Sequence, residues 1–165
     1  MSHQRLTRTA LLRGLGTAGY LALAGGAAGM ARGRTDAFEV HFTQAEWRKR
    51  LGPERYNILR EAGTERAGTS PLLNEHRRGI FACAGCNLPT FSSSTKFESG
   101  TGWPSFYRAL PGSVRERSDR SLIEERTEIL CRRCGGHMGH VFTDGPQPTG
   151  LRYCMNGLAL VFHPQ

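Results

Sequence analysis

Two short segments set the architecture of this chain: CAGC at residues 83–86 and CRRCG at residues 131–135. Each segment places two sulfur atoms on one tight turn, and two such turns supply the four soft ligands of a tetrahedral structural zinc site. Residues 87–130 separate the pairs, which is a longer spacing than in a compact zinc ribbon. We therefore predict one structural Zn²⁺ that joins two distant β-hairpins through Cys83, Cys86, Cys131 and Cys134.

Two other uses of these cysteines are open. An exported protein could form two disulfides instead, and a redox-active Cys-x-x-Cys is a third option. The redox motif normally begins a helix in a βαβ unit, a setting that neither pair has, and the pair count and tight-turn glycines favour zinc. A closed four-thiolate site has no open coordination position, so we expect the chemistry to lie elsewhere in the chain.

From Gly79 onward, short apolar runs alternate with Gly, Pro, Ser and Asn, a texture typical of antiparallel β structure rather than of βαβ units. The dipeptide Asn156-Gly157 predicts a hairpin between the last two strands. The expected strands cover residues 80–82, 113–117, 121–124, 128–130, 138–142, 151–155 and 159–162.

Two short helices are expected before this β region. TQAE at residues 43–46 is a capping box, and Gly52 ends the helix that it starts. Pro53 suits the first turn of a second helix, which Gly63 closes. The expected apolar positions are Trp47 and Leu51 in the first helix, and Tyr56, Leu59 and Ala62 in the second.

The composition fits one packed domain preceded by a basic leader. The chain has 165 residues, of which 38% are hydrophobic, and this argues against general disorder and against a multi-span membrane protein. The formal net charge is +8, from 22 basic and 14 acidic residues. Residues 1–34 contain five arginines and no acid, so 17 basic and 14 acidic residues, a net +3, remain from Thr35 onward. This small excess argues against nucleic-acid binding.

Residues 1–34 read as an export signal and linker. A basic start at residues 5–13 precedes a mildly apolar, glycine-rich run at 15–31 that ends in small residues. Residues 7–12 resemble a twin-arginine signal without its second arginine, so the route is either twin-arginine-like or general secretory. We expect cleavage near residue 31, a periplasmic protein and no stable membrane insertion afterwards. An uncleaved N-terminal tail is the alternative.

The fifth cysteine, Cys154, is the candidate nucleophile. A lone cysteine is often buried and inert, but Arg152 lies two residues away on the same face of a predicted strand, and a guanidinium favours the thiolate. Asn156 can add a hydrogen bond at the same site.

Two further segments supply candidate site residues. In GHMGH at residues 136–140, His137 and His140 each follow a glycine, and either can move a proton. In GTGWPSF at residues 100–106, Trp103 is expected on a rigid turn, either as core or as a pocket wall.

Together these motifs resemble the B-class peptide methionine sulfoxide reductases, which act on the R epimer. The matching pieces are the cysteine pairs, GTGWPSF, HMGHVF at 137–142 and DGPQPTGLRYCMN at 144–156. The similarity extends from about Thr43 to Phe162. It implies a mainly β fold of two antiparallel sheets clasped by a structural zinc, with short N-terminal helices. Residues 35–165 would then form a single catalytic domain.

The resemblance also implies a mechanism and roles. Cys154 would attack the sulfoxide sulfur, release methionine and become a sulfenic acid. His140, aided by His137 and Asn156, would supply a proton, and Arg152 would favour the thiolate. Trp103 and Phe106 would contact the substrate. The expected partners are oxidised proteins that carry methionine sulfoxide and a thioredoxin-like protein or small-thiol reductant. The implied role is the repair of oxidative damage.

The chain departs from the family at two positions. Many relatives carry a resolving cysteine where this chain has Thr101, and Gly157 stands where Ser is more usual. A non-catalytic, zinc-clasped β module that binds proteins is the main alternative function. Nucleic-acid binding, supported by Arg132-Arg133, is a weaker one.

Overall fold

The computed structural model describes residues 37–121 and 125–165. The expected leader and residues 122–124 of one expected strand lie outside the described residues. Within the described ranges, no helix is both long and apolar enough to cross a membrane. The elements are α1 (Gln44–Glu61), η1 (Pro71–Asn74), β1 (Gly79–Cys83), β2 (Pro89–Ser92), η2 (Ser93–Thr95), β3 (Lys96–Phe97), β4 (Ser105–Phe106), β5 (Val114–Asp119), β6 (Arg126–Cys131), β7 (His137–Phe142), β8 (Arg152–Met155), η3 (Gly157–Ala159) and β9 (Leu160–Pro164).

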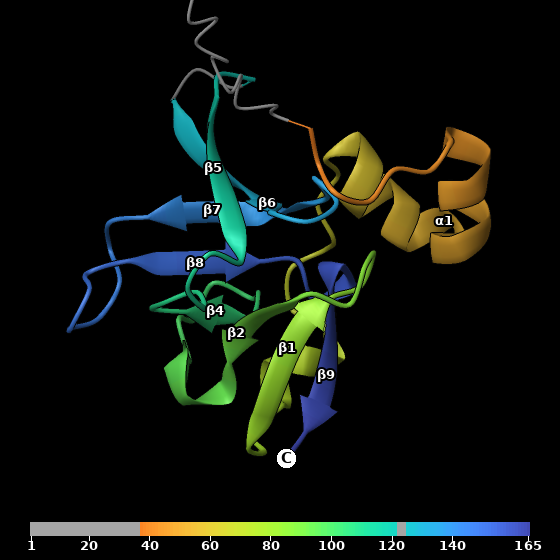
Figure 1. Cartoon of the computed structure of the whole chain (residues 1–165). Coiled ribbons are helices and arrows are strands. Elements are labelled where there is room, and N and C mark those ends of the chain that lie inside the picture. Colours follow the sequence, from red (N-terminus) through yellow and green to blue (C-terminus); the bar gives the residue numbers. More distant parts are fainter. Residues whose placement is uncertain (1–36, 122–124) are drawn as a thin grey trace, which may run out of the picture. The chain divides into compact units, whose positions relative to one another are not determined.

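The strands form two antiparallel sheets, as the sequence predicts. The smaller sheet has the order β2-β1-β9, and the larger has the order β3-β4-β8-β7-β6-β5. Figure 1 shows β8 running between β4 and β7 in the larger sheet. Strands β2, β3 and β4 were not expected, whereas the other strands lie at or close to their predicted positions.

The helical region also follows the prediction, with one correction. Glu46 N–H donates to the Thr43 hydroxyl over 3.3 Å, and the Glu46 carboxylate accepts from Thr43 N–H over 2.8 Å, which completes the capping box. Gly52, at φ 69° and ψ 173°, breaks α1 into two helical parts just before Pro53. The prediction that Ala62 faces the core is wrong, because this residue is exposed and left-handed and ends the helix one position before Gly63.

Helix α1 packs on β7 and η3 and shares one core with both sheets. Its buried positions within this core are Trp47, Tyr56, Ile58 and Leu59. At the centre of the β region, the Phe106 ring stacks on Phe91 with centroids 4.5 Å apart and meets Phe81 edge-on at 5.0 Å. The aromatic rings therefore join the two sheets from inside.

The predicted Asn156-Gly157 hairpin is wrong. Strands β8 and β9 belong to different sheets, and the segment between them is the single turn η3. A two-residue type I′ turn needs positive φ at both central residues, but Asn156 has φ −61°. Asn156 is the residue that precedes η3, so the dipeptide carries the chain from one sheet to the other.

Candidate functional site

The four paired cysteines converge on one point, as predicted. Their sulfur atoms all lie within 4.8 Å of one another, and none forms a disulfide. Cys83 Sγ is 3.7 Å from Cys134 Sγ, and Cys86 Sγ is 3.5 Å from Cys131 Sγ. Zinc–sulfur bonds of about 2.3 Å would place the sulfurs of a regular tetrahedron about 3.8 Å apart. The two shortest sulfur–sulfur distances are close to this value, so the four thiols form a cluster of the size that a Zn²⁺ ion needs.

The position of these thiols explains why the metal clasps the fold. Cys83 ends β1 in the smaller sheet, and Cys131 ends β6 in the larger one, while their partners lie on the turns that follow. Hydrogen bonds from Cys131 and Cys134, together with burial, raise the pKa of Cys83. Four thiolates held this closely would repel one another, and a divalent cation would offset that repulsion.

Helix α1 and the segment before it, residues 37–43, support the metal site from outside. Arg60 stacks over the Trp47 ring, with 4.7 Å from its guanidinium carbon to the ring centroid, and donates to the Cys134 carbonyl over 2.9 Å. Gly135 has φ +67°, and a Cβ atom there would lie 2.3 Å from the Phe38 ring. Gly135 is thus required, whereas a Cβ at Gly85 would make only ordinary contacts.

Cys154 lies at the centre of the larger sheet, on β8. Strand register places it opposite Ser105 of β4 on one side and opposite His140 of β7 on the other. Directly opposed residues of antiparallel strands point to the same face. Pairing between strands far apart in sequence therefore brings a thiol, a hydroxyl and an imidazole together.

A β-bulge brings the second histidine to the same place. His137 and His140 are an odd number of residues apart, so regular alternation would point them to opposite faces. The β6–β7 register shifts between Ile129 and Leu130, which inserts one extra residue into β7. The two imidazole centroids consequently lie 5.4 Å apart.

Each histidine is held by its own carboxylate. His137 Nδ1 is 2.7 Å from Glu128 Oε1, and His140 Nε2 is 2.8 Å from Asp119 Oδ2. Burial lowers the pKa of His137, against the opposing effect of Glu128. Because a carboxylate oxygen accepts, Nδ1 carries the proton of the contact with Glu128. Its Nε2 atom has no hydrogen-bond partner among the described residues.

The Asp119 carboxylate remains charged beside His140. Hydrogen bonds from Ser121, followed by those from His140 and Arg126, hold the pKa of Asp119 below its ordinary range. Arg126 approaches the same carboxylate to 2.7 Å. Asp119 thus fixes the orientation of the His140 ring.

Arg152 lies near the thiol, but its guanidinium is also paired with the Asp144 carboxylate. Its guanidinium forms two hydrogen bonds with Asp144, of 2.9 and 2.8 Å, and stacks over the Phe142 ring at 4.4 Å. The bonds with Asp144 raise the pKa of Arg152, and its proximity to the Cys154 sulfur adds to the effect. Arg152 therefore supplies a positive charge near the sulfur that Asp144 partly balances.

A pocket of about 130 Å³ opens over Cys154 and His140, whereas the predicted residues His137 and Arg152 are not part of its lining. Its lining includes the predicted residues Trp103, His140, Cys154 and Asn156. It also includes Thr64, Arg126 and Phe142, which the sequence analysis did not assign. Phe142 belongs to a quoted motif, whereas nothing in the local sequence marks Thr64 or Arg126, because tertiary contacts bring them to the site.

Glu65 connects three parts of the site. Its carbonyl accepts from the Trp103 indole N–H over 3.1 Å, and its own N–H donates to Asn156 Oδ1 over 3.0 Å. Its buried carboxylate accepts from the N–H groups of Gly157 and Leu158 over 2.6 and 2.9 Å. Glu65 therefore holds Trp103 and the turn that follows Cys154 in one arrangement.

The structure corrects or narrows three expectations. Phe106 does not line the pocket: it is adjacent to Ser105 on β4, so its side chain faces the opposite way and is 0% exposed in the core. Asn156 lines the pocket, but its amide bonds backbone groups of Glu65 and Met138, which gives it a positioning role. At Gly157 a Cβ would lie 1.8 Å from Ser70 Oγ, so the unusual glycine accommodates Ser70.

The metal site makes the first prediction. The purified protein should contain one zinc per chain, and Cys131→Ser should lose the metal and reduce the free energy of unfolding by about 4 kcal/mol or more. Cys154→Ser is the matched control and should keep both zinc and stability. Metal analysis and denaturant unfolding measure these effects. A native protein without zinc but with two disulfides by mass would contradict the assignment.

Glu65 makes the second prediction. Glu65→Gln replaces one acceptor oxygen by a donor that faces a backbone N–H, so the free energy of unfolding should fall by about 1–3 kcal/mol. The indole of Trp103 should also become more mobile, as its fluorescence anisotropy would show in a Trp47→Phe background. Glu61→Gln, which changes only exposed contacts with Arg48 and Asn57, should change stability by less than about 1 kcal/mol. Equal effects of both variants would refute the role of Glu65.

Comparison with known proteins places this arrangement in a family. The SelR domain matches residues 51–164. Peptide methionine sulfoxide reductase MsrB of Thiobacillus denitrificans is 59% identical over 124 residues, which cover 74% of this chain and 94% of that protein. MsrB of Agrobacterium fabrum is 53% identical over 127 residues, covering 76% and 94%. Chloroplastic peptide methionine sulfoxide reductase B1 of Arabidopsis thaliana is 50% identical over 119 residues, covering 72% and 59%. Because the domain match spans most of its length and these relatives share half or more of the aligned residues, the chain belongs to the SelR-domain family of the MsrB proteins.

Proposed function

We propose that this protein reduces the R epimer of methionine sulfoxide in oxidised proteins to methionine. The observation that carries the proposal is the convergence of the Cys154 thiol, the His140 imidazole and the Trp103 indole on one pocket. A nucleophile, a proton source and an apolar wall are the three groups that this reaction needs. The preference for the R epimer rests on the family alone.

The reaction is an oxygen transfer between two sulfur atoms. The Cys154 thiolate attacks the sulfoxide sulfur, and the oxygen passes to the cysteine sulfur as methionine leaves. The sulfoxide sulfur is reduced by two electrons, the cysteine sulfur is oxidised by two, and a proton from the site completes the sulfenic acid. No other oxidant or reductant is needed for this half of the cycle.

The residues around Cys154 supply the proton transfer and the substrate contact. The departing oxygen needs a proton or a strong hydrogen bond, and His140, held by Asp119, faces the pocket at the strand position opposite the thiol. His137 lies next to His140, and its Nε2 atom has no partner among the described residues, so this nitrogen is available for proton transfer. Trp103 offers apolar and sulfur–aromatic contact to the methyl group of the substrate. The zinc supplies structural support at its own four ligands.

The mechanism predicts distinct effects at two residues. Cys154→Ser should abolish turnover of methionine sulfoxide while the fold remains intact, because a hydroxyl cannot replace the thiolate. Trp103→Ala should mainly raise KM, by about 5- to 30-fold for a loss of roughly 1–2 kcal/mol of apolar contact, whereas Trp103→Phe should lose less. Kinetics with the separate R and S epimers would measure both. Substantial turnover by Cys154→Ser would refute the mechanism.

The non-catalytic binding module is the less favoured function. A module of that kind has no use for a thiol, a carboxylate-bound histidine and an indole in one pocket, with a second carboxylate-bound histidine next to it. Blocking Cys154 by alkylation would leave such a module unchanged but would inactivate a reductase.

The recycling step follows from Thr101. Its hydroxyl oxygen is 3.7 Å from Cys154 Sγ, the position from which a cysteine could close a disulfide. A hydroxyl cannot do so, and the other four cysteines belong to the metal site. We therefore propose that the sulfenic acid persists until an external thiol attacks it, either a thioredoxin-like protein or a small thiol.

A single turnover without reductant tests this recycling. A sulfenic-acid trap should then label Cys154 in the unmodified protein. In Thr101→Cys the new thiol should form a disulfide with Cys154 and suppress the label. Peptide mass mapping distinguishes these products. An intramolecular disulfide to Cys154 in the unmodified protein, with zinc retained, would contradict the proposal.

We also propose that residues 1–34 export the protein to the periplasm. The support is the order of basic residues, apolar run and small residues in the sequence. The route is either twin-arginine-like or general secretory. Recovery of the uncleaved chain in the cytosol of fractionated native cells would overturn this proposal.

A further inference from the structure

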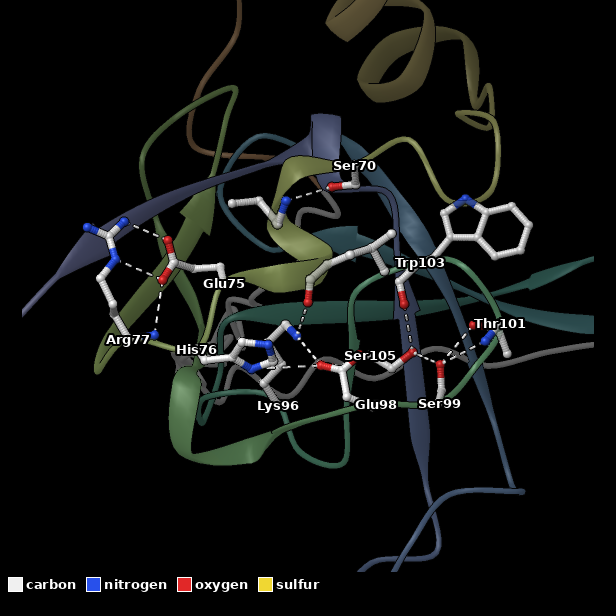
Figure 2. A network of polar contacts seen from close by, with 12 residues as sticks. Ser70, Glu75, His76, Arg77, Lys96, Glu98, Ser99, Thr101, Trp103 and Ser105 are labelled. Atoms are coloured by element: carbon white, nitrogen blue, oxygen red, sulfur yellow. Dashed lines mark hydrogen bonds and ion pairs between the residues drawn. The ribbon is translucent and has the colours of Figure 1, made fainter.

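A chain of hydroxyl groups runs from the nucleophile into the protein. Thr101 Oγ1 lies 3.7 Å from Cys154 Sγ and 2.8 Å from Ser99 Oγ. Ser99 Oγ is 2.7 Å from Ser105 Oγ, which donates to the Trp103 carbonyl over 3.1 Å. Figure 2 shows Thr101, Ser99, Ser105 and the Trp103 carbonyl in this sequence. No step of the function described above uses these hydroxyls as donors.

The Trp103 carbonyl at the end of this series of hydroxyl groups determines which way the hydroxyl protons point. A carbonyl only accepts, so Ser105 must use its single proton toward Trp103. Ser99 can then donate its own proton to the Ser105 hydroxyl oxygen, which is free to accept. The Thr101 proton is left with two acceptors, Ser99 or the sulfur. When Cys154 ionises, the charged sulfur is the stronger acceptor.

The charged and titratable groups near the sulfur lie on β8 itself and on the β7 side of the sheet. Arg152 approaches along β8 but is bound to Asp144. His140 of β7 is bound to Asp119, which also forms an ion pair with Arg126 of β6. On the β4 side the register partner of Cys154 is the neutral Ser105, which is 1% exposed. From that side, the hydroxyl chain supplies the polar contact to the sulfur.

We propose that Thr101 is a catalytic residue whose hydroxyl donates a hydrogen bond to the Cys154 thiolate, and that Ser99 and Ser105 are positioning residues that orient it. Thr101 thus has a function of its own at the position where relatives carry a resolving cysteine. The proposal rests on the proposed function only in taking Cys154 as the reacting group, because its test measures the thiol directly.

The test measures the rate at which iodoacetamide alkylates Cys154 as a function of pH, in the zinc-loaded full chain. Peptide mapping separates the alkylation of Cys154 from that of the other cysteines. Thr101→Val keeps the side-chain shape and removes the hydroxyl. A hydrogen bond to a charged sulfur shifts the thiol–thiolate equilibrium by about tenfold, so the midpoint of the profile should rise by about one pH unit. A less stabilised thiolate is also the stronger nucleophile. The rate should therefore fall about threefold at low pH and rise about threefold at the high-pH plateau.

Three further variants make the result specific. Thr101→Ser restores the hydroxyl and should restore the original profile. Ser99→Ala should shift the midpoint in the same direction as Thr101→Val but by less, because it removes only the orienting contact. Thr90→Val is the matched control: it deletes a fully buried hydroxyl that donates to the Phe81 carbonyl in the smaller sheet. This control should leave the profile unchanged even where it lowers stability.

Two outcomes would overturn the proposal. One is an unchanged profile in folded, zinc-containing Thr101→Val, and the other is an equal shift in Thr101→Ser or Thr90→Val. The proposed reductase function fails separately, if the unmodified protein does not reduce methionine sulfoxide, and that result would leave the alkylation profiles and the hydroxyl assignment standing.

Discussion

Four thiols within 4.8 Å of one another are the constraint on which the rest of this structure depends. They come from the ends of β1 and β6, two strands in different sheets, and from the turns after them. Such a cluster is stable only around a divalent cation, because four thiolates repel one another and four buried thiols contribute little. The metal therefore supplies a cross-link between the two sheets that the short strands alone could not provide.

The reacting group lies two strands from this cross-link. Cys131 ends β6, β6 pairs with β7, and β7 pairs with β8, where Cys154 lies opposite His140. The bulge in β7 then turns His137 to the same side. Polar contacts outside the sheet complete the site, since Glu65 holds Trp103 against the turn after Cys154. The pocket is thus defined by strand register and by a few long-range hydrogen bonds.

The sequence reveals the parts whose signal is local. Cysteine spacing predicts the metal site, the capping box and Gly52 predict the divided helix, and alternating runs predict the longer strands. Strands β3 and β4 have two residues each, too few for alternation to appear. The Asn156-Gly157 signal misleads because the Glu65 carboxylate binds the N–H of Gly157 from far along the chain. Phe106 was placed with its motif, although Ser105 before it takes the face toward the site. Arg126 lines the pocket and is held there by an ion pair with Asp119, a contact that no local sequence pattern predicts.

Hydrogen–deuterium exchange on zinc-loaded and zinc-depleted protein tests most directly whether the metal holds β8, the strand that carries Cys154, in place. If the account is correct, removal of zinc will abolish protection in β1 and β6 together, and the loss will extend through β7 to the amides of β8 around Cys154. Protection of β8 that persists unchanged in the zinc-depleted protein, with β1 and β6 opening independently, would contradict it.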